Sequence, residues 1–307
     1  MANENTTSTL ADSLPVIRQS ARIVTELSGT MTSPDVVEVI QLEENQGLSW
    51  NEISLAKITA QPIGETTCLD NPKRFCDTLL QVTPTLIGIQ TVITDRVRMR
   101  VSSNVAAQWG QLTGNAINRK MNQDGHTVLD GATTSLGGGA CAALDAGELV
   151  AAAVRIDASC DAPVLPGRHA VLHPYAIHDI WSEIVQIGLA SSTGAKGVTA
   201  SITQLNGSSL ADNAFTQGQS AVGTVGGVSI HKDSLISTSG SAAKGGVFSH
   251  CGVLLVRGRS PRIFAERKNS FGGGADVLFH YEEFAFGERA AGNRLFEIHS
   301  DATAPAG

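Results

Sequence analysis

We first consider Cys141 as a candidate catalytic residue. It follows a run of three glycines and precedes an expected helix, whose terminal amides can stabilise a thiolate. A nucleophilic cysteine also needs a neighbouring base, and no histidine stands at a motif spacing from it. We therefore favour a small loop residue before a helix over a catalytic thiol.

Histidines form the second candidate group, with His169, His173 and His178 spaced as H-x3-H-x4-H. The first two fall on an expected strand and the third on an expected helix. This spacing matches no strong zinc signature, so histidines in the core or at its rim are the favoured interpretation. His250, next to Cys251, is a weaker candidate still.

A glycine-rich run and two pairs of adjacent carboxylates complete the candidates. Ser270 to Val277, SFGGGADV, lacks the lysine and the hydroxyl residue of a phosphate loop, so we expect a turn between strands. Glu43 with Glu44, and Glu282 with Glu283, are sequence neighbours whose side chains point apart on a helix or a strand. The sequence thus indicates no catalytic, cofactor-binding or metal-binding residues.

Composition points to a globular protein made and folded in a cytosol. The chain has 307 residues, 42% of them hydrophobic, and no apolar run that could span a bilayer. Its N-terminus does not have the pattern of a secretory signal. Five cysteines without paired spacing fit reduced thiols. The net charge of −7 gives no indication of a surface that binds nucleic acid. The arginines at 96, 98 and 100 suggest a face that is solvated or lies between subunits.

The element that must organise the rest is Thr94 to Gly131, which we predict to be one long helix and its exit. Ser102 or Ser103 can cap its start, and Asn122 to Gly125 supplies residues that end it. The predicted apolar stripe has the helical period and consists of Val105, Trp109, Leu112 and Ala116, widened by Ala106, Ile117 and Met121.

Two glycines inside this helix cost about 1 kcal/mol each relative to alanine, so packing must hold the helix. We interpret Gly110 and Gly114 as points where another backbone comes close or where the helix bends. A Gly114→Leu variant is then expected to impair assembly more than the solubility of the single chain.

Before this helix the chain has few elements that can stand alone. A short helix is expected between Ser13 and Gly29, and two extended runs surround the turn at Asn45 to Gly47. A two-stranded ribbon of this kind is marginal in isolation, so a multimer is expected. Pro84 then opens a strand whose Ile87, Ile89, Thr91 and Ile93 share one face.

After the helix, strands and helices alternate, which predicts a mixed α and β class. Asp145 begins a helix as its cap, and a strand at 169–172, a break at Pro174 and a second helix follow. Loops are expected at 206–223 and 237–246. The strands expected are 223–236, 248–258, 261–268, 277–288 and 294–300, with a bulge or a change of sheet near Glu282 and Glu283.

This order of elements resembles the major capsid proteins of tailed bacteriophages that share the Hong Kong 97 fold. The segments that carry the resemblance are the arm, the ribbon, the long helix ending in HTVLDG, the VLHPYAIHDIW segment, GTVGGVSIHKDSLI and the last pair of strands. The resemblance implies an α+β fold with an N-terminal arm at 1–35, an extended β-hairpin loop at 36–82, a peripheral domain with the spine helix at 83–131, an axial domain at 132–276, and a return to the peripheral domain at 277–307. Residues 237–246 would lie near the local symmetry axis.

The same resemblance implies a non-enzymatic structural protein that self-assembles as hexamers and pentamers into an icosahedral shell. The shell would enclose double-stranded DNA without sequence specificity, and would be assembled in the cytoplasm of a bacterial host. A portal protein, and scaffolding or decoration proteins, would be its partners, with no membrane. Because no long coiled-coil-like segment stands before the arm in this sequence, we expect no fused scaffolding segment, and a separate scaffold or a removed leader stays open. Lys57 with Asn269 near Glu266 matches the family's cross-link weakly, so we expect a non-covalent shell.

Two alternatives stay open at this point. An encapsulin-like compartment would use the same fold around a cargo enzyme. A cytosolic α/β enzyme that uses Cys141 or the His169 to His178 group would belong to another class.

Overall fold

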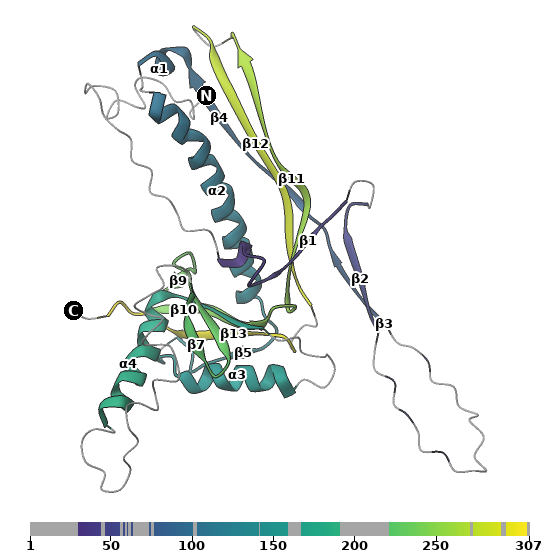
Figure 1. The fold of residues 1–307 in the computed structure, drawn as a ribbon, viewed down its shortest axis with the longest axis vertical. Coiled ribbons are helices and arrows are strands. Elements are labelled where there is room, and N and C mark those ends of the chain that lie inside the picture. The colour runs from purple at the N-terminus through teal and green to yellow at the C-terminus, as the bar shows by residue number, and fades with distance from the viewer. Residues whose placement is uncertain are drawn as a thin grey trace.

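The structure, a computed structural model, describes residues 30–43, 47–55, 58, 60, 63, 74, 77–100, 103–140, 142–158, 167–190, 221–270, 273–289 and 293–305. Figure 1 shows its plan: one long helix lies along a tall, narrow sheet, a broader sheet with two helices lies below, and a hairpin projects to one side. Helices and strands are mixed, as the α+β prediction requires. The predicted helix before Gly29 and the loop at 206–220 lie outside the described residues.

The tall sheet has the strand order β1-β11-β12-β4. Its strands are β1 (Glu38–Gln41), β11 (Val253–Lys268), β12 (Ala275–Glu288) and β4 (Thr85–Thr94). β1 runs parallel to β11, and the other pairs are antiparallel. Gly273 and Gly274 have positive φ in the connection from β11 to β12, as expected of a turn there.

The structure of β11 differs from the sequence prediction in the bounds of the strand and in the position of the bulge. We expected separate strands at 248–258 and 261–268, whereas 253–268 form one strand and His250 lies in the turn before it. The expected irregularity near Glu283 exists, but it lies in β11, where the register shifts on both sides of Arg259. A Cβ at Gly258 would come within 2.8 Å of the Glu283 side chain, so a larger residue at this bend would displace that side chain. β12 itself stays in one sheet.

The described part of the long helix consists of two segments, and the second segment runs further than predicted. α1 covers Asp95–Arg100 and α2 covers Ser103–Asp130, so Asn122 to Gly125 do not end it. The predicted stripe is confirmed at Ile117 and Met121, which are buried, and is wrong at Leu112, which is 47% exposed in the single chain, and at Ala116, which is also exposed. The side chains at 105, 106 and 109 lie outside the described part. The residues of α2 that are buried are Ile117, Met121, Asn122, Gly125, His126 and Leu129.

Asn122 and Gly125 fit inside the helix because both face the N-terminal segment that crosses it. The Asn122 side chain accepts a hydrogen bond from the backbone N–H of Met31 (2.9 Å) and donates one to Asp233 (2.5 Å). A Cβ at Gly125 would lie 2.7 Å from the Met31 Cβ. Met31 belongs to the short 3-10 helix η1 (Thr30–Thr32). These tertiary contacts outweigh the helix-ending tendency of the two residues.

The broad sheet has the order β5-β13-β10-β6-β8-β7, with β9 paired to β10. Its strands are β5 (Ser135–Leu136), β13 (Leu295–Asp301), β10 (Ala242–Ser249), β6 (Arg168–Leu172), β8 (Val228–Lys232), β7 (Ala221–Val225) and β9 (Thr238–Ser239). α3 (Ala146–Ala158) and α4 (Pro174–Ala190) pack on it. Asp145 caps α3 through the N–H of Gly147 (2.8 Å), as predicted.

Two expectations within this sheet are wrong. Residues 223–236 are not one strand, because Gly226 and Gly227, both with positive φ, form the turn that joins antiparallel β7 and β8. Residues 237–246 are not a free loop, because β9 pairs with β10 and Gly240 lies in the turn. By contrast, the unit of strand, Pro174 and helix has the predicted form.

The projecting hairpin consists of β2 (Trp50–Leu55) and β3 (Asp77–Val82), which pair antiparallel. We expected the two runs on either side of Asn45 to Gly47 to form the ribbon. Instead, the first run is β1, which pairs with β11, and the second pairs with β3. The base of the hairpin packs on the tall sheet through Trp50, Leu80 and Val82.

The two sheets divide the chain differently from the predicted domain boundaries. β11, within the predicted axial segment 132–276, belongs to the tall sheet with β4. β13, within the predicted return segment 277–307, belongs to the broad sheet. The sequence could not reveal this exchange, because the pairing of each strand depends on partners that are distant in the sequence.

Candidate intersubunit surfaces

The predicted chemical residues do not form a catalytic or metal site among the residues that the structure describes. Cys141, Glu44 and Lys57 lie outside these residues. Asn269 and Glu266 are exposed at the end of β11, so a link to Lys57 stays untested. In the described part of the chain, no group of three or more His, Cys, Asp or Glu side chains could hold a metal ion.

The histidines are regrouped by the sheet. His178 lies on α4 near Asp179 (3.8 Å) and is separate from His169. His169 instead meets His231 of β8, with 3.1 Å between their Nδ1 and Nε2 atoms, and its ring centre lies 6.2 Å from that of His250. Burial, followed by the charges of His231 and His250, lowers the pKa of His169 to about 4. The sequence did not reveal that β6 pairs in parallel with β8, and this pairing is what brings His169 and His231 together.

Glu282 and Glu283 point to opposite faces of β12, as predicted. Glu282 is buried, and this burial raises its pKa despite the nearby Arg257. Glu283 lies over Gly258 on the other face. The pair cannot cooperate as acid and base.

The arginines of α1 are partly engaged at the end of the tall sheet. Arg98 contacts Asp276 at 2.7 Å, and Arg267 contacts Asp276 at 3.0 Å as well as Asp95. Arg96 and Arg100 are exposed. This arrangement leaves a charged, solvated tip, in line with the sequence interpretation.

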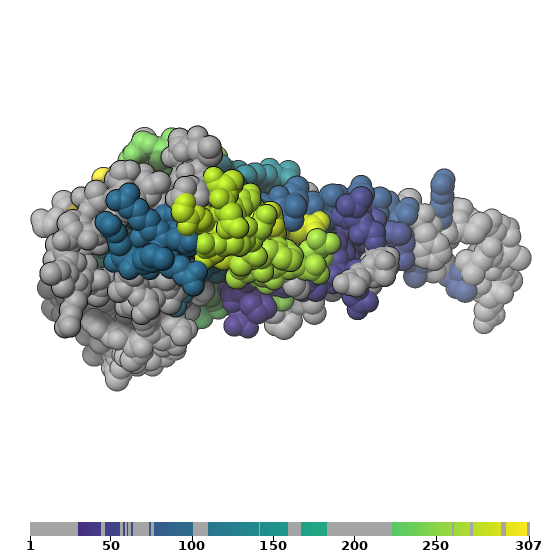
Figure 2. All heavy atoms as spheres, turned by 90° about the horizontal axis from the view of Figure 1, so that it is seen from above, coloured from purple at the N-terminus to yellow at the C-terminus, as the bar shows by residue number. Residues whose placement is uncertain are grey.

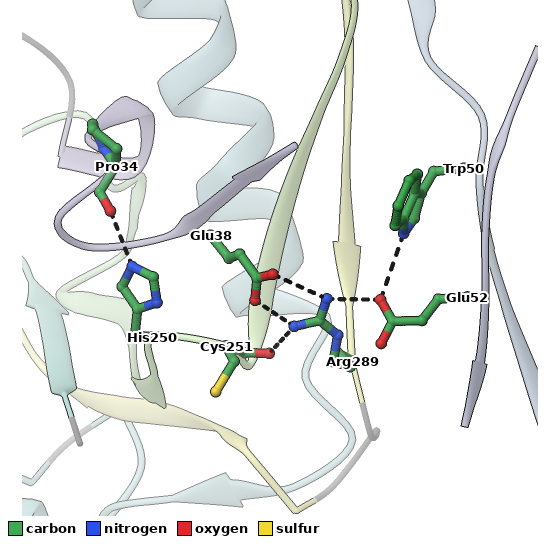
Figure 3. A network of polar contacts seen from close by, with 7 residues as sticks. All are labelled: Pro34, Glu38, Trp50, Glu52, His250, Cys251 and Arg289. Carbon is green, nitrogen blue, oxygen red and sulfur yellow. Dashed lines mark hydrogen bonds and ion pairs between the residues drawn. The ribbon is translucent and has the colours of Figure 1, made fainter. Parts of the chain in front are cut away.

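A partly buried arginine directly after β12 anchors the base of the hairpin (Figure 3). The Arg289 guanidinium donates to Glu38 of β1 (2.5 Å), to Glu52 of β2 (2.7 Å) and to the Cys251 carbonyl (3.1 Å). Burial opposes its charge, but these carboxylates outweigh burial and raise the pKa of Arg289. Its side chain is only 15% exposed. We call Arg289, Glu38 and Glu52 the clamp.

The clamp joins segments that are far apart in the sequence. Trp50 Nε1 points at Glu52 (3.5 Å), and His250 donates to the carbonyl of Pro34 (3.0 Å) beside the same turn (Figure 3). The hairpin and the segment that follows the N-terminal arm are therefore fixed to one corner of the tall sheet. Sequence reasoning missed Arg289, which no motif distinguishes from other arginines.

Beyond the clamp, the hairpin projects to one side of the molecule (Figure 2). Its strands carry large apolar side chains that are exposed. Ile53 is 62% exposed and Leu79 is 64% exposed. The tall sheet also exposes large apolar side chains: Leu86 of β4 and Ile263 and Phe264 of β11 are more than half exposed. Exposed apolar patches of this kind mark surfaces that other proteins cover. An edge strand with such side chains is an aggregation hazard in a lone chain.

No described helix combines the length and the apolar character needed to cross a bilayer.

Comparison with known proteins gives a structural answer without a sequence match. No protein-family profile and no curated protein matches the sequence. The capsid of Ralstonia phage GP4 is similar in structure, with a TM-score of 0.69 at 12% identity over 95% of this chain and 97% of that chain. The cyanophage Pam1 capsid has a TM-score of 0.69 at 13% identity, over 99% of this chain and 100% of that chain. The head of Helicobacter pylori bacteriophage KHP40 has a TM-score of 0.64 at 10% identity, over 99% of this chain and 98% of that chain. Over nearly its full length, the chain therefore has the Hong Kong 97 fold of tailed-phage capsid subunits.

Proposed function

We propose that the chain is a major capsid protein, which self-assembles into an icosahedral shell of a tailed phage. The observation that carries this proposal is the projecting hairpin, whose exposed apolar side chains are not covered by the described part of the chain. Full-length similarity to capsid subunits supports it. In such a shell the hairpin would lie on a neighbouring copy and bury these side chains.

The domain roles follow the two sheets in this proposal. The tall sheet with α2 would be the peripheral domain, and the broad sheet with α3 and α4 would be the axial domain around each hexamer or pentamer centre. Residues 1–35 would be the arm, and the hairpin of β2 and β3 would be the extended loop, whereas β1, which we had expected in that loop, belongs to the tall sheet. The turn at Gly240, between β9 and β10, would face the local symmetry axis.

The proposal further includes packaged double-stranded DNA, a portal protein and assembly in a bacterial cytoplasm, with no enzymatic role. The net negative charge of the chain supports an inner shell surface that binds DNA phosphates weakly. Tight phosphate contacts would make DNA release slow and salt-dependent. A Cβ added at Gly110 or Gly114 would meet no atom within 4 Å among the described residues of other elements. In this proposal, a close backbone contact there would come from a neighbouring copy.

The test is analysis of particles purified after expression in a host infected by the phage or carrying it as a prophage. Nuclease-protected double-stranded DNA inside uniform particles supports the proposal. Particles that contain a protein cargo and no DNA would favour the encapsulin-like alternative. Replacing Cys141 with alanine should leave particle yield unchanged, whereas a loss of yield would revive a role for the thiol.

A further inference from the structure

One acidic side chain is buried between α2 and the tall sheet without a partner. Glu282 lies in the second half of β12 and is 5% exposed. Its carboxyl group makes no hydrogen bond and no ion pair with the residues that the structure describes, and burial raises its pKa. A buried charge in this state is costly, so the folded chain favours the neutral, protonated carboxyl group.

The strand register places Glu282 on the face of the tall sheet that α2 covers. Side chains alternate along a strand, so Glu282 points to the same side as Phe284. Phe284 packs in one core cluster with Ile117 and Met121 of α2. The residue opposite Glu282 on β4 is Ile87, which packs against the same cluster. The carboxyl group therefore lies where the helix meets the sheet, a contact that we call the seam.

Few charged groups face the seam. On the sheet they are Arg257 of β11 and His280 of β12, and both lower the pKa of Glu282 less than burial raises it. β4 has no charged residue between Thr85 and Thr94, and the chain has none from 101 to 118, which includes the first half of α2. The helix thus offers no counter-charge to an ionised Glu282.

Glu282 lies level with a part of α2 that contains glycine. A Cβ at Gly125 would lie 3.3 Å from the Phe286 ring, which aligns the helix with the strand. α2 and β12 run in the same direction from the same end of the tall sheet (Figure 1). The step from Phe286 back to Glu282 spans about 13 Å, which corresponds to about nine helix residues. This places Glu282 level with the helical turn that contains Gly114.

We propose that Glu282 is a proton-dependent switch that holds α2 closed on the tall sheet when the carboxyl group is protonated. Loss of the proton places a charge in the seam, and the helix then lifts around Gly114 and admits water to that charge. Glycine resists this bending least, because it has the lowest helix propensity after proline.

The direction of the pH dependence follows from the sign of the shift. The pKa of Glu282 in the folded chain lies above its ordinary value of 4.5. The contribution of the protonated group to stability is therefore fully present below about pH 4.5 and is lost as the pH rises through the folded-state pKa. The switch is closed in acid and opens toward alkaline pH.

Hydrogen exchange of the purified full-length chain at about pH 4.5 and about pH 8 tests the switch, after correction for the intrinsic effect of pH on exchange. We expect the protection of the amides at 110–121 to fall about fivefold or more toward pH 8, because protection reports local opening. The protection of β10 and β13 should not fall. Glu282→Gln, which has the same shape and no charge, should keep α2 protected at both pH values.

Glu283→Gln is the matched control. It makes the same change one residue further along β12, but this side chain points to the opposite face and lies over Gly258. The variant should lose protection in α2 as the unchanged chain does, within about twofold. His169, whose protonation destabilises the broad sheet in acid, is present in all three proteins, so its contribution cancels in the comparison.

A structural role for an ionised Glu282 beside Arg257 predicts the opposite result. Glu282→Gln would then lower the protection of α2 at pH 8, and this outcome would overturn the proposal. An equal pH response in Glu282→Gln and the unchanged chain, or no loss of α2 protection in the unchanged chain, would overturn it as well. If Glu282→Gln does not fold, the response of the unchanged chain still decides. The measurement needs no shell, so its failure would leave the proposed function standing.

Discussion

The broad sheet and the hairpin region of this molecule differ in how far a single chain can complete them. In the broad sheet, Val247, Phe248 and Ile298 are fully buried, and α3 and α4 cover one face. In the hairpin region, Ile53 and Leu79 are more than 60% exposed, and the packing on the tall sheet involves the base of the hairpin. One region is a closed core and the other is half of an interface.

The difference shows where the free energy of each region has to come from. The closed core gains its stability from apolar area that the chain itself removes from water. A two-stranded hairpin is marginal by itself, so its order depends on the clamp and on whatever covers it. Substitutions in the first region should therefore lower the stability of the chain, whereas substitutions in the second should lower assembly.

The largest effect on the chain is predicted for Phe248→Ala. Phe248 is fully buried between the broad sheet and the segment around Met31, so its truncation removes a large apolar side chain and leaves a cavity. We expect a loss of about 3–5 kcal/mol in the free energy of unfolding. Urea denaturation of the unassembled chain measures it. A loss below about 1 kcal/mol would show that this core is not closed.

A smaller loss is predicted for Arg289→Leu, which removes the cation of the clamp. Two carboxylates, Glu38 and Glu52, are then left together at the base of the hairpin. We expect a loss of about 2–3 kcal/mol, largely confined to this corner. Hydrogen exchange should quicken in β2, β3 and β1 and stay unchanged in the broad sheet. Uniform quickening in both regions would contradict the division between them.

The third prediction concerns pH and the histidines of the broad sheet. The unfolded chain binds a proton at His169 below its ordinary pKa of 6.5, whereas the folded chain binds it only near pH 4. Stability must therefore fall as the pH falls from about 6.5 to about 4, by about 2 kcal/mol after allowance for the partial exposure of the ring.

Urea denaturation at pH 7.5 and pH 4.5 tests this, with His169→Asn as the comparison. The substitution should reduce the loss between the two values. Asp233, whose pKa is lowered to about 2, contributes stability that is lost only below about pH 4, so it does not interfere. An identical loss in the variant would remove His169 as the cause.

The smallest change in the stability of the chain is predicted for Leu79→Asn in the hairpin. The same substitution is predicted to have a large effect on assembly. An exposed side chain contributes little to folding, so the free energy of unfolding should change by less than about 0.5 kcal/mol. Particle yield on a sucrose gradient should nevertheless collapse. Thr78→Asn is the control on the opposite face of β3 and should keep its particles. Normal particles from Leu79→Asn would mean that this face is not an interface.

Sequence reasoning succeeded where local chemistry decides the structure. The cap at Asp145, the break at Pro174 and the glycine turn near Gly273 depend on the conformational preferences of single residues. The order of elements was sufficient to predict the fold, which the structural similarity to phage capsids confirms.

Sequence reasoning failed where partners distant in the sequence decide. Asn122 and Gly125 have the residue types of a helix end, but Met31 and Asp233 hold them in the helix interior. β13 joined the broad sheet because Phe296 and Ile298 fit its core, which no local pattern reveals. Arg289 lies more than 200 residues from both of its carboxylates, so the clamp could not be predicted either.

Electron microscopy of the purified full-length protein, together with its elution volume in size-exclusion chromatography, tests the central claim most directly. Because the hairpin region is half of an interface, we predict uniform closed shells that elute in the void volume. A protein that stays a stable, soluble monomer at high concentration would contradict the account.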